Sequence, residues 1–169
     1  MTVSAPHPRT LQRLGTHLTL KTWRQVLKTL IPHYAAKRLT DEEVLRKLLT
    51  DWSAPGNVGA SGEAANYAAA LRLPEAASIS LEQLRWSYLS TSKINGREHM
   101  ALTRRFVNAT VWAVRGERDP LLPARAWRKD LEFARGNYRF IEVPDAGHFV
   151  QEEQPSRVTE LVLEFLAQI

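Results

Sequence analysis

Thr110-Val111-Trp112-Ala113-Val114 and Tyr138-Arg139-Phe140-Ile141-Glu142-Val143 are the two segments that decide the fold of this chain. Each is short, rich in β-branched and aromatic residues, and bounded by turn-forming residues, which is typical of a buried strand. The first strand is predicted to stop at Arg115-Gly116-Glu117-Arg118-Asp119-Pro120. The second is predicted to stop at Pro144-Asp145-Ala146-Gly147-His148-Phe149.

Helical patterns surround these strands. A helix is predicted at 123–134, with Leu131 on its buried face, and a second at 155–167, where Leu166 belongs to the apolar stripe. Strand and helix therefore alternate, which predicts a parallel sheet. Val3–Pro8 reads as the end of another strand followed by a proline-stiffened turn. Two strands and two helices make an incomplete sheet, so the rest of the sheet is expected to lie outside this pattern.

The two strand ends carry the candidate chemistry, because ligands bind outside the carboxyl ends of parallel strands. Asp119 follows the first strand and His148 follows the second. These two residues are the candidates for catalysis. The alternatives are an Asp-Pro turn for Asp119 and a turn histidine beside a glycine for His148.

The region before Thr110 is predicted to be mostly helical. Thr40 and Ser80 each begin a capping-box pattern, so each is predicted to be a helix N-cap. Ser53–Gly62 is rich in Gly and Pro and is predicted to be a loop, and Asn95-Gly96 is predicted to be a turn.

Composition indicates a globular protein of one domain: 169 residues, of which 44% are hydrophobic and 24% charged. The net charge of +5 is spread along the chain, so a solvated surface is favoured over nucleic-acid binding. Absence of cysteine excludes disulfides and thiolate metal sites. We expect no cofactor and no metal, since the other histidines lack metal-ligand spacing. No signal peptide or membrane span is recognised, and a cytoplasmic location is the default.

At these residues the chain resembles the C-terminal part of an α/β-hydrolase, in the epoxide-hydrolase branch. The acid precedes the histidine by 148 − 119 = 29 residues, in the chain order of nucleophile, acid and histidine. The tail Gln151-Glu152-Glu153-Gln154-Pro155 and the closing amphipathic helix also match. The resemblance covers Thr110–Ile169 closely.

The resemblance implies two regions: a helical cap (lid) at 1–105 and the last βαβα part of the core at 106–169. Pro6-His7-Pro8 resembles the segment that leaves the sixth core strand. The earlier strands and the nucleophile elbow are then expected upstream of Met1. His148 would be the general base, and Asp119 would hold its tautomer.

A nucleophile was sought inside the chain. Gly59-Ala60-Ser61-Gly62-Glu63 is the nearest match to an elbow, but Glu63 occupies a small position and no strand precedes it. Ser61 is better interpreted as a helix N-cap. No other serine or aspartate fits.

Epoxide hydrolases also use two cap tyrosines as proton donors. Arg24 occupies the place where the first is expected, and Tyr88 lies one place late for the second. Four aromatic residues remain candidates for contact with a substrate: Trp23, Tyr34, Tyr67 and Tyr88.

Two functional hypotheses follow. In the first, the chain is the acid–base half of a hydrolase for small, mostly apolar substrates, and is inactive alone. In the second, it is a non-catalytic binding module or degenerate fragment of the same ancestry. Its exposed sheet edge would then be covered by a partner or by self-association.

Overall fold

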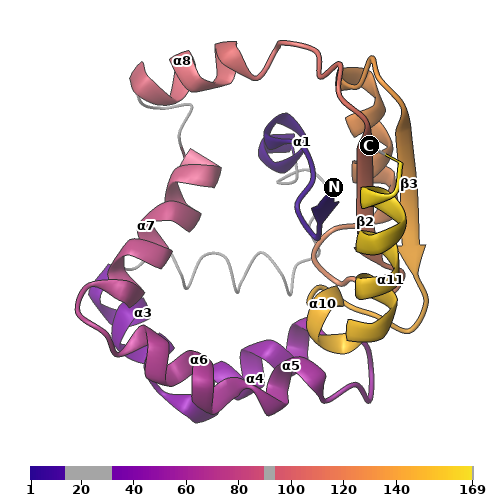
Figure 1. Ribbon diagram of the computed structural model, residues 1–169. Coiled ribbons are helices and arrows are strands. Elements are labelled where there is room, and N and C mark those ends of the chain that lie inside the picture. Colours follow the sequence, from indigo (N-terminus) through magenta and orange to yellow (C-terminus); the bar gives the residue numbers. More distant parts are fainter. Residues whose placement is uncertain (14–31, 90–93, 169) are drawn as a thin grey trace.

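The computed structural model describes residues 1–13, 32–89 and 94–168, and it confirms the predicted α/β fold class (Figure 1). Its sheet is parallel, with the strand order β1 (Thr2–Val3), β2 (Val111–Gly116) and β3 (Tyr138–Val143). The register pairs Val111 with Tyr138 and Gly116 with Val143. The strand expected at Val3 is therefore present, and it adds a third strand to the two that the C-terminal pattern predicted.

The middle strand, β2, continues two residues beyond its predicted end. Arg115 is buried at 3% exposure, which a sequence pattern would not assign to an arginine inside a strand. Its Nη1 donates to Glu142 on the neighbouring strand, and its Nη2 donates to the carbonyl of Glu117 at 3.3 Å. Because these acceptors satisfy the charged group, the strand can extend through it.

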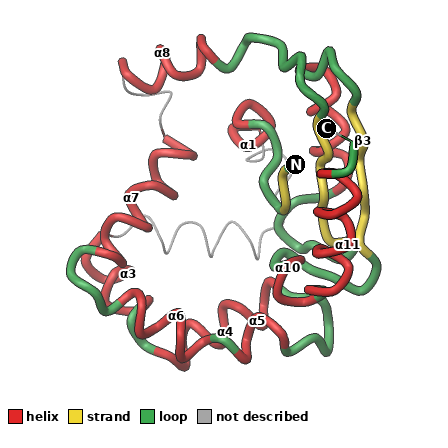
Figure 2. The backbone as a smooth tube through the Cα atoms, in the orientation of Figure 1, coloured by secondary structure: helices red, strands yellow, loops and turns green. Residues whose placement is uncertain are grey.

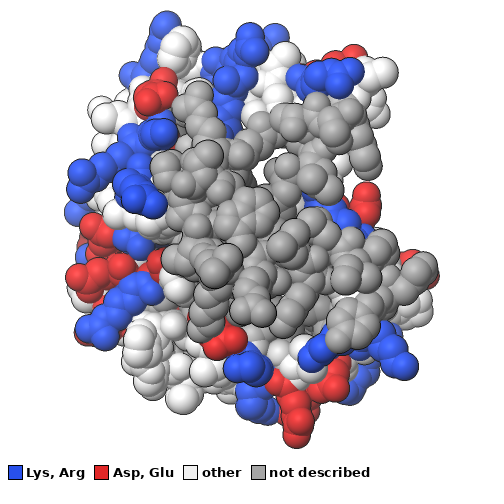
Figure 3. Space-filling view, turned by 180° about the vertical axis from the view of Figure 1, so that it is seen from behind, with Lys and Arg blue, Asp and Glu red and all other residues white. Residues whose placement is uncertain are grey.

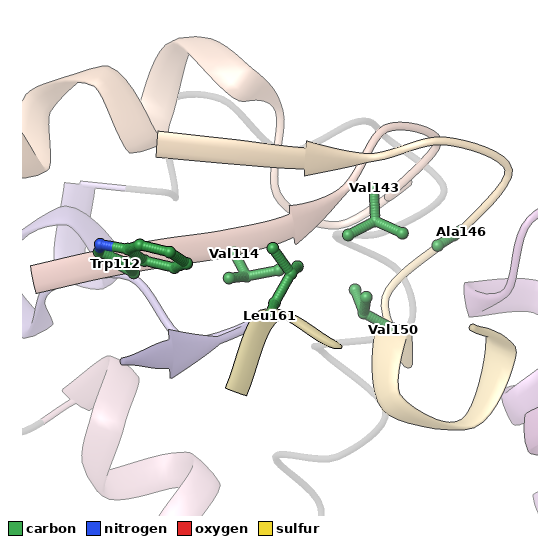
Figure 4. Packing of buried hydrophobic residues seen from close by; sticks show 6 residues of the cluster. All are labelled: Trp112, Val114, Val143, Ala146, Val150 and Leu161. Atoms are coloured by element: carbon green, nitrogen blue, oxygen red, sulfur yellow. The ribbon is translucent and has the colours of Figure 1, made fainter. Parts of the chain in front are cut away.

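Both faces of β2 are covered, as a parallel strand requires. On one face, Trp112 and Val114 pack against α11 (Pro155–Leu166), and Leu161 is fully buried there (Figure 4). On the other face, Ala113 packs against α9 (Ala124–Trp127) and the 3-10 helix η3 (Arg128–Phe133), with Trp127 fully buried.

The helix predicted at 123–134 was wrong in its second half. The chain changes to 3-10 geometry after Trp127, which narrows the spiral and rotates the following side chains. Leu131 is therefore 57% exposed instead of facing the sheet. Leu166, placed in the apolar stripe of the last helix, is 56% exposed because it lies in the final turn of α11.

The region between β1 and β2 is helical, as predicted, and forms an open arc beside the sheet (Figures 1 and 2). Its described helices are α1 (Pro8–Arg13), α3 (Pro32–Leu39), α4 (Glu42–Trp52), α5 (Gly59–Gly62), α6 (Ala64–Leu71), α7 (Ala76–Leu89) and α8 (Ile94–Leu102). Leu45 and Leu49 of α4 form a core with alanines of α5 and α6, and Phe149 packs against it. The helical region therefore touches the segment that carries His148.

Several predicted boundaries in this region were wrong for local reasons. Asp41, not Thr40, caps α4, because its side chain accepts hydrogen bonds from two free backbone N–H groups. Ser80 lies inside α7, where its hydroxyl donates to the carbonyl four residues earlier. Residues 59–62 form the short helix α5, and Asn95-Gly96 lies inside α8.

None of the described helices is long and apolar enough to cross a membrane. On the face shown in Figure 3, the basic side chains of the described residues are interspersed with acidic ones.

Candidate acid–base site

The loops that follow β2 and β3 are joined by backbone hydrogen bonds. Glu117 N donates to the carbonyl of Val143 at 2.9 Å, and Arg118 N donates to that of Ala146 at 2.9 Å. Asp145 takes a left-handed conformation, with φ of 53°, which turns the second loop back toward the first. The two carboxyl ends are therefore held side by side.

Asp119 and His148 meet across these loops. Asp119 Oδ2 lies 3.0 Å from His148 Nδ1. The Asp119 side chain is fully buried, and its Oδ1 accepts from the backbone N–H groups of Leu121 at 2.8 Å and Leu122 at 3.1 Å. Because a carboxylate can only accept, Nδ1 carries the proton of this contact. The lone pair of the neutral ring then lies on Nε2.

The imidazole is also held by the helical region. His148 N donates to the carbonyl of Trp52, at the end of α4, over 2.9 Å. The Trp52 ring meets the imidazole edge-on, with centroids 5.8 Å apart. The His148 side chain keeps 20% of its exposure, and we find no hydrogen-bond partner for Nε2 among the described residues. The arrangement can take a proton from a donor placed next to Nε2.

Glu153 is a site residue for which the sequence gave no role. Its carboxylate is buried, and it accepts from the backbone N–H groups of Ala54, Gly147 and Phe149. Its position six residues after Gly147, in α10 (Val150–Glu153), was visible in the sequence. Its partners were not, because they are backbone groups.

The four aromatic candidates are not brought together with this pair. Tyr67 donates its hydroxyl to Glu152, and burial followed by this hydrogen bond raises the pKa of Tyr67 to about 12. Tyr34 and Tyr88 lie in α3 and α7, but their side chains lie outside what the structure describes, and Trp23 lies outside the described residues altogether.

Two serines bear on the question of a nucleophile. Ser61 lies inside α5 and donates to the carbonyl of Val58, so its prediction as an N-cap was wrong. Ser4 follows β1 with φ of 52°, and its hydroxyl is buried without a hydrogen-bond partner in the described part of the chain. No base contacts Ser4 there, so it is not an activated nucleophile in this structure.

A second group of titratable residues lies beside β1. Asp130 accepts from His7 N at 2.8 Å and from the Thr10 hydroxyl, and burial raises the pKa of Asp130 despite these bonds. Burial lowers the pKa of His7 and raises the pKa of Tyr138 to about 12. A pocket of about 260 Å³, lined by His7, Asp130 and apolar residues, opens here. Among the described residues, no cluster of His, Asp and Glu could hold a metal ion.

Comparison with known proteins supports the fold. No protein-family model matches the sequence, and no curated protein matches it. Three solved structures are similar. An epoxide hydrolase, CorEH, is 24% identical over 86% of this chain and 50% of its own, with a TM-score of 0.62. Epoxide hydrolase A from Mycobacterium thermoresistibile is 21% identical over 84% and 51%, with a TM-score of 0.61. The 2-hydroxy-6-oxo-6-phenylhexa-2,4-dienoate hydrolase from Rhodococcus is 14% identical over 80% and 50%, with a TM-score of 0.52.

This chain thus spans about half the length of each solved protein. Identities this low establish the fold alone. With its parallel strands, helices on both faces and structural neighbours of this kind, the chain has the α/β-hydrolase fold, represented over about half the length of its structural neighbours.

Proposed function

We propose that this chain supplies the acid and the base of a hydrolytic site of the epoxide-hydrolase type. The observation that carries the proposal is the contact between Asp119 Oδ2 and His148 Nδ1 at 3.0 Å. The carboxylate is buried and fixed by two backbone N–H groups, whereas the imidazole reaches solvent. This asymmetry suits an orienting acid behind a general base.

In this mechanism Nε2 of His148 takes a proton from a serine, or from a water that attacks an aspartyl ester. Asp119 keeps the proton on Nδ1 and stabilises the imidazolium that forms. The nucleophile would come from a segment outside the described residues, which would pair with the edge strand β1. Residues 1–105 would act as the cap and 106–169 as part of the core, enclosing a small, mostly apolar substrate.

Support for the epoxide-hydrolase branch comes from the sequence around His148 and from the fold of the neighbours. Tyr67 is a poor proton donor in this arrangement, because its hydroxyl is bound to a carboxylate and its pKa is raised to about 12. The alternative is a non-catalytic module of the same ancestry. It is favoured by the lack of a nucleophile beside Nε2 in the described part of the chain.

An assay with p-nitrophenyl acetate and styrene oxide tests the missing nucleophile. We expect no turnover by the purified chain above that of His148→Ala. Ser4→Ala is the matched control, because Ser4 is the serine at the end of a described strand. Turnover that disappears in both variants would place the nucleophile inside this chain and overturn the proposal.

Asp119→Asn tests the pair itself. The asparagine oxygen can keep both backbone hydrogen bonds, but its amide then faces Nδ1 and must donate to it. The imidazole proton is expected to move from Nδ1 to Nε2, which nitrogen chemical shifts of His148 report directly. An unchanged tautomer would show that Asp119 does not orient the base, and the non-catalytic alternative would then be preferred.

A further inference from the structure

The buried carboxylate of Glu153 contacts the backbone on both sides of His148. Its Oε2 accepts from Gly147 N at 2.8 Å, and its Oε1 accepts from Phe149 N at 3.0 Å. These are the residues directly before and after the proposed base. The backbone of His148 therefore cannot shift without stretching a hydrogen bond to this side chain.

The same carboxylate reaches the helical region. Oε2 also accepts from Ala54 N at 2.7 Å, across 99 residues of sequence. Two residues earlier in that segment, the carbonyl of Trp52 accepts from His148 N. The corner at 52–54 is thus bound once to the base and once to Glu153, so one side chain links the helical region to the loop of the base.

The chemistry of Glu153 makes this link strong. The residue is only 6% exposed, and we find no ion pair for it in the described part of the chain. Its three backbone donors are what replaces the water that burial removes. A buried carboxylate with fewer donors would be destabilised, so the three N–H groups and the carboxylate fix one another's positions.

We propose that Glu153 is a positioning residue, which holds the imidazole of His148 against Asp119 and registers the helical region on the loop of the base. The catalytic meaning of this role rests on the proposed function; the geometry does not. Glu153 acts through the backbone of Gly147 and Phe149 and does not itself touch the reacting nitrogen.

The test compares Glu153→Gln and Glu153→Ala with Glu152→Gln. Glu152 is the matched control because it is the neighbouring glutamate, and its side chain binds the Tyr67 hydroxyl instead of the loop. Amide exchange at Gly147 and Phe149 is measured together with the Nδ1–H resonance of His148 in the full chain.

Amide exchange at both positions should rise by about tenfold or more in Glu153→Ala. In Glu153→Gln one oxygen can still serve two donors, so exchange should rise at Phe149 and remain slow at Gly147. The Nδ1–H resonance should broaden or vanish in both variants and persist in Glu152→Gln. A folded Glu153→Gln with an unchanged resonance would overturn the proposal. Loss of folding in both Glu153 variants would also overturn it, by making Glu153 a folding residue.

These readouts do not depend on turnover. If the chain never supports hydrolysis, but the resonance responds to Glu153, the proposed function fails and the positioning role stands. If Asp119→Asn moves the tautomer, but the Glu153 variants leave the ring unchanged, the positioning role fails and the acid–base pair stands.

Discussion

Gly147→Ala is expected to destabilise the protein by about 3 kcal/mol, although it adds a single methyl group. A Cβ at this position would lie 2.4 Å from Ala54 N and 2.5 Å from the carbonyl carbon of Ser53. An ordinary contact needs 3.4 Å or more, so the shortfall is 3.4 − 2.4 = 1.0 Å. Both neighbours are backbone atoms, which cannot swing aside as a flexible side chain does.

The magnitude follows from what must move. Overpacking a close-packed region costs about 1–3 kcal/mol. A displacement of 1.0 Å would also lengthen the bond from Ala54 N to Glu153 beyond hydrogen-bond distance, since that bond starts at 2.7 Å. A hydrogen bond to a charged group contributes about 1.5–3 kcal/mol. For a chain of this length, a loss of about 3 kcal/mol lowers the melting temperature by about 6–12 °C.

Thermal unfolding followed by circular dichroism measures this effect, with Gly62→Ala as the control. Gly62 ends α5, and a Cβ there would meet nothing within 4 Å. Alanine at that position should be neutral or stabilising by up to about 1 kcal/mol, because it reduces the entropy of the unfolded chain. If Gly147→Ala melted within about 2 °C of the wild type, the loop and the corner at 53–54 would not be packed as described.

Three further predictions concern the core and the titratable groups. Leu161→Ala should cost about 2–5 kcal/mol in urea unfolding, whereas Leu163→Ala on the same helix should change stability by at most about 0.5 kcal/mol, since Leu161 is fully buried and Leu163 is 62% exposed. Glu152→Gln should lower the pKa of Tyr67 from about 12 while leaving it above 10.0, because burial is the larger cause of the shift; carbon NMR of the tyrosine ring measures it, and an unchanged value would contradict the hydrogen bond. Because burial raises the pKa of Asp130 above 3.8, its contribution to stability is present at lower pH and lost as pH rises through the folded-state pKa; Asp130→Asn should flatten this part of the profile, measured by urea unfolding between about pH 3 and pH 7.

The sequence was informative wherever the local signal and the tertiary structure agreed. The β3 strand has the predicted bounds, because its alternation of apolar and polar residues matches one buried face between two turns. The positions of Asp119 and His148 at strand ends could likewise be predicted, since a parallel sheet aligns its carboxyl ends. Their roles remain a proposal.

Boundaries failed where one residue type serves two purposes. A serine hydroxyl that could cap a helix can equally bond to a carbonyl one turn back, and Ser80 does the latter inside α7. Thr40 lost the capping position to Asp41, whose carboxylate is the better acceptor for two N–H groups. Propensity alone does not separate these outcomes. Glu153 was missed for a different reason: backbone N–H groups are the same at every non-proline residue, so the sequence does not identify its partners.

The location of these contacts decides what can be tested in this chain. The proton on Nδ1 of His148 depends on Asp119, which is fixed by Leu121 and Leu122 in the same loop. The backbone of His148 depends on Trp52 and Glu153. All of these groups belong to the described residues, so the orientation of the base does not require the nucleophile. Tautomer and exchange measurements can therefore establish or refute the acid–base pair even if the chain shows no hydrolysis.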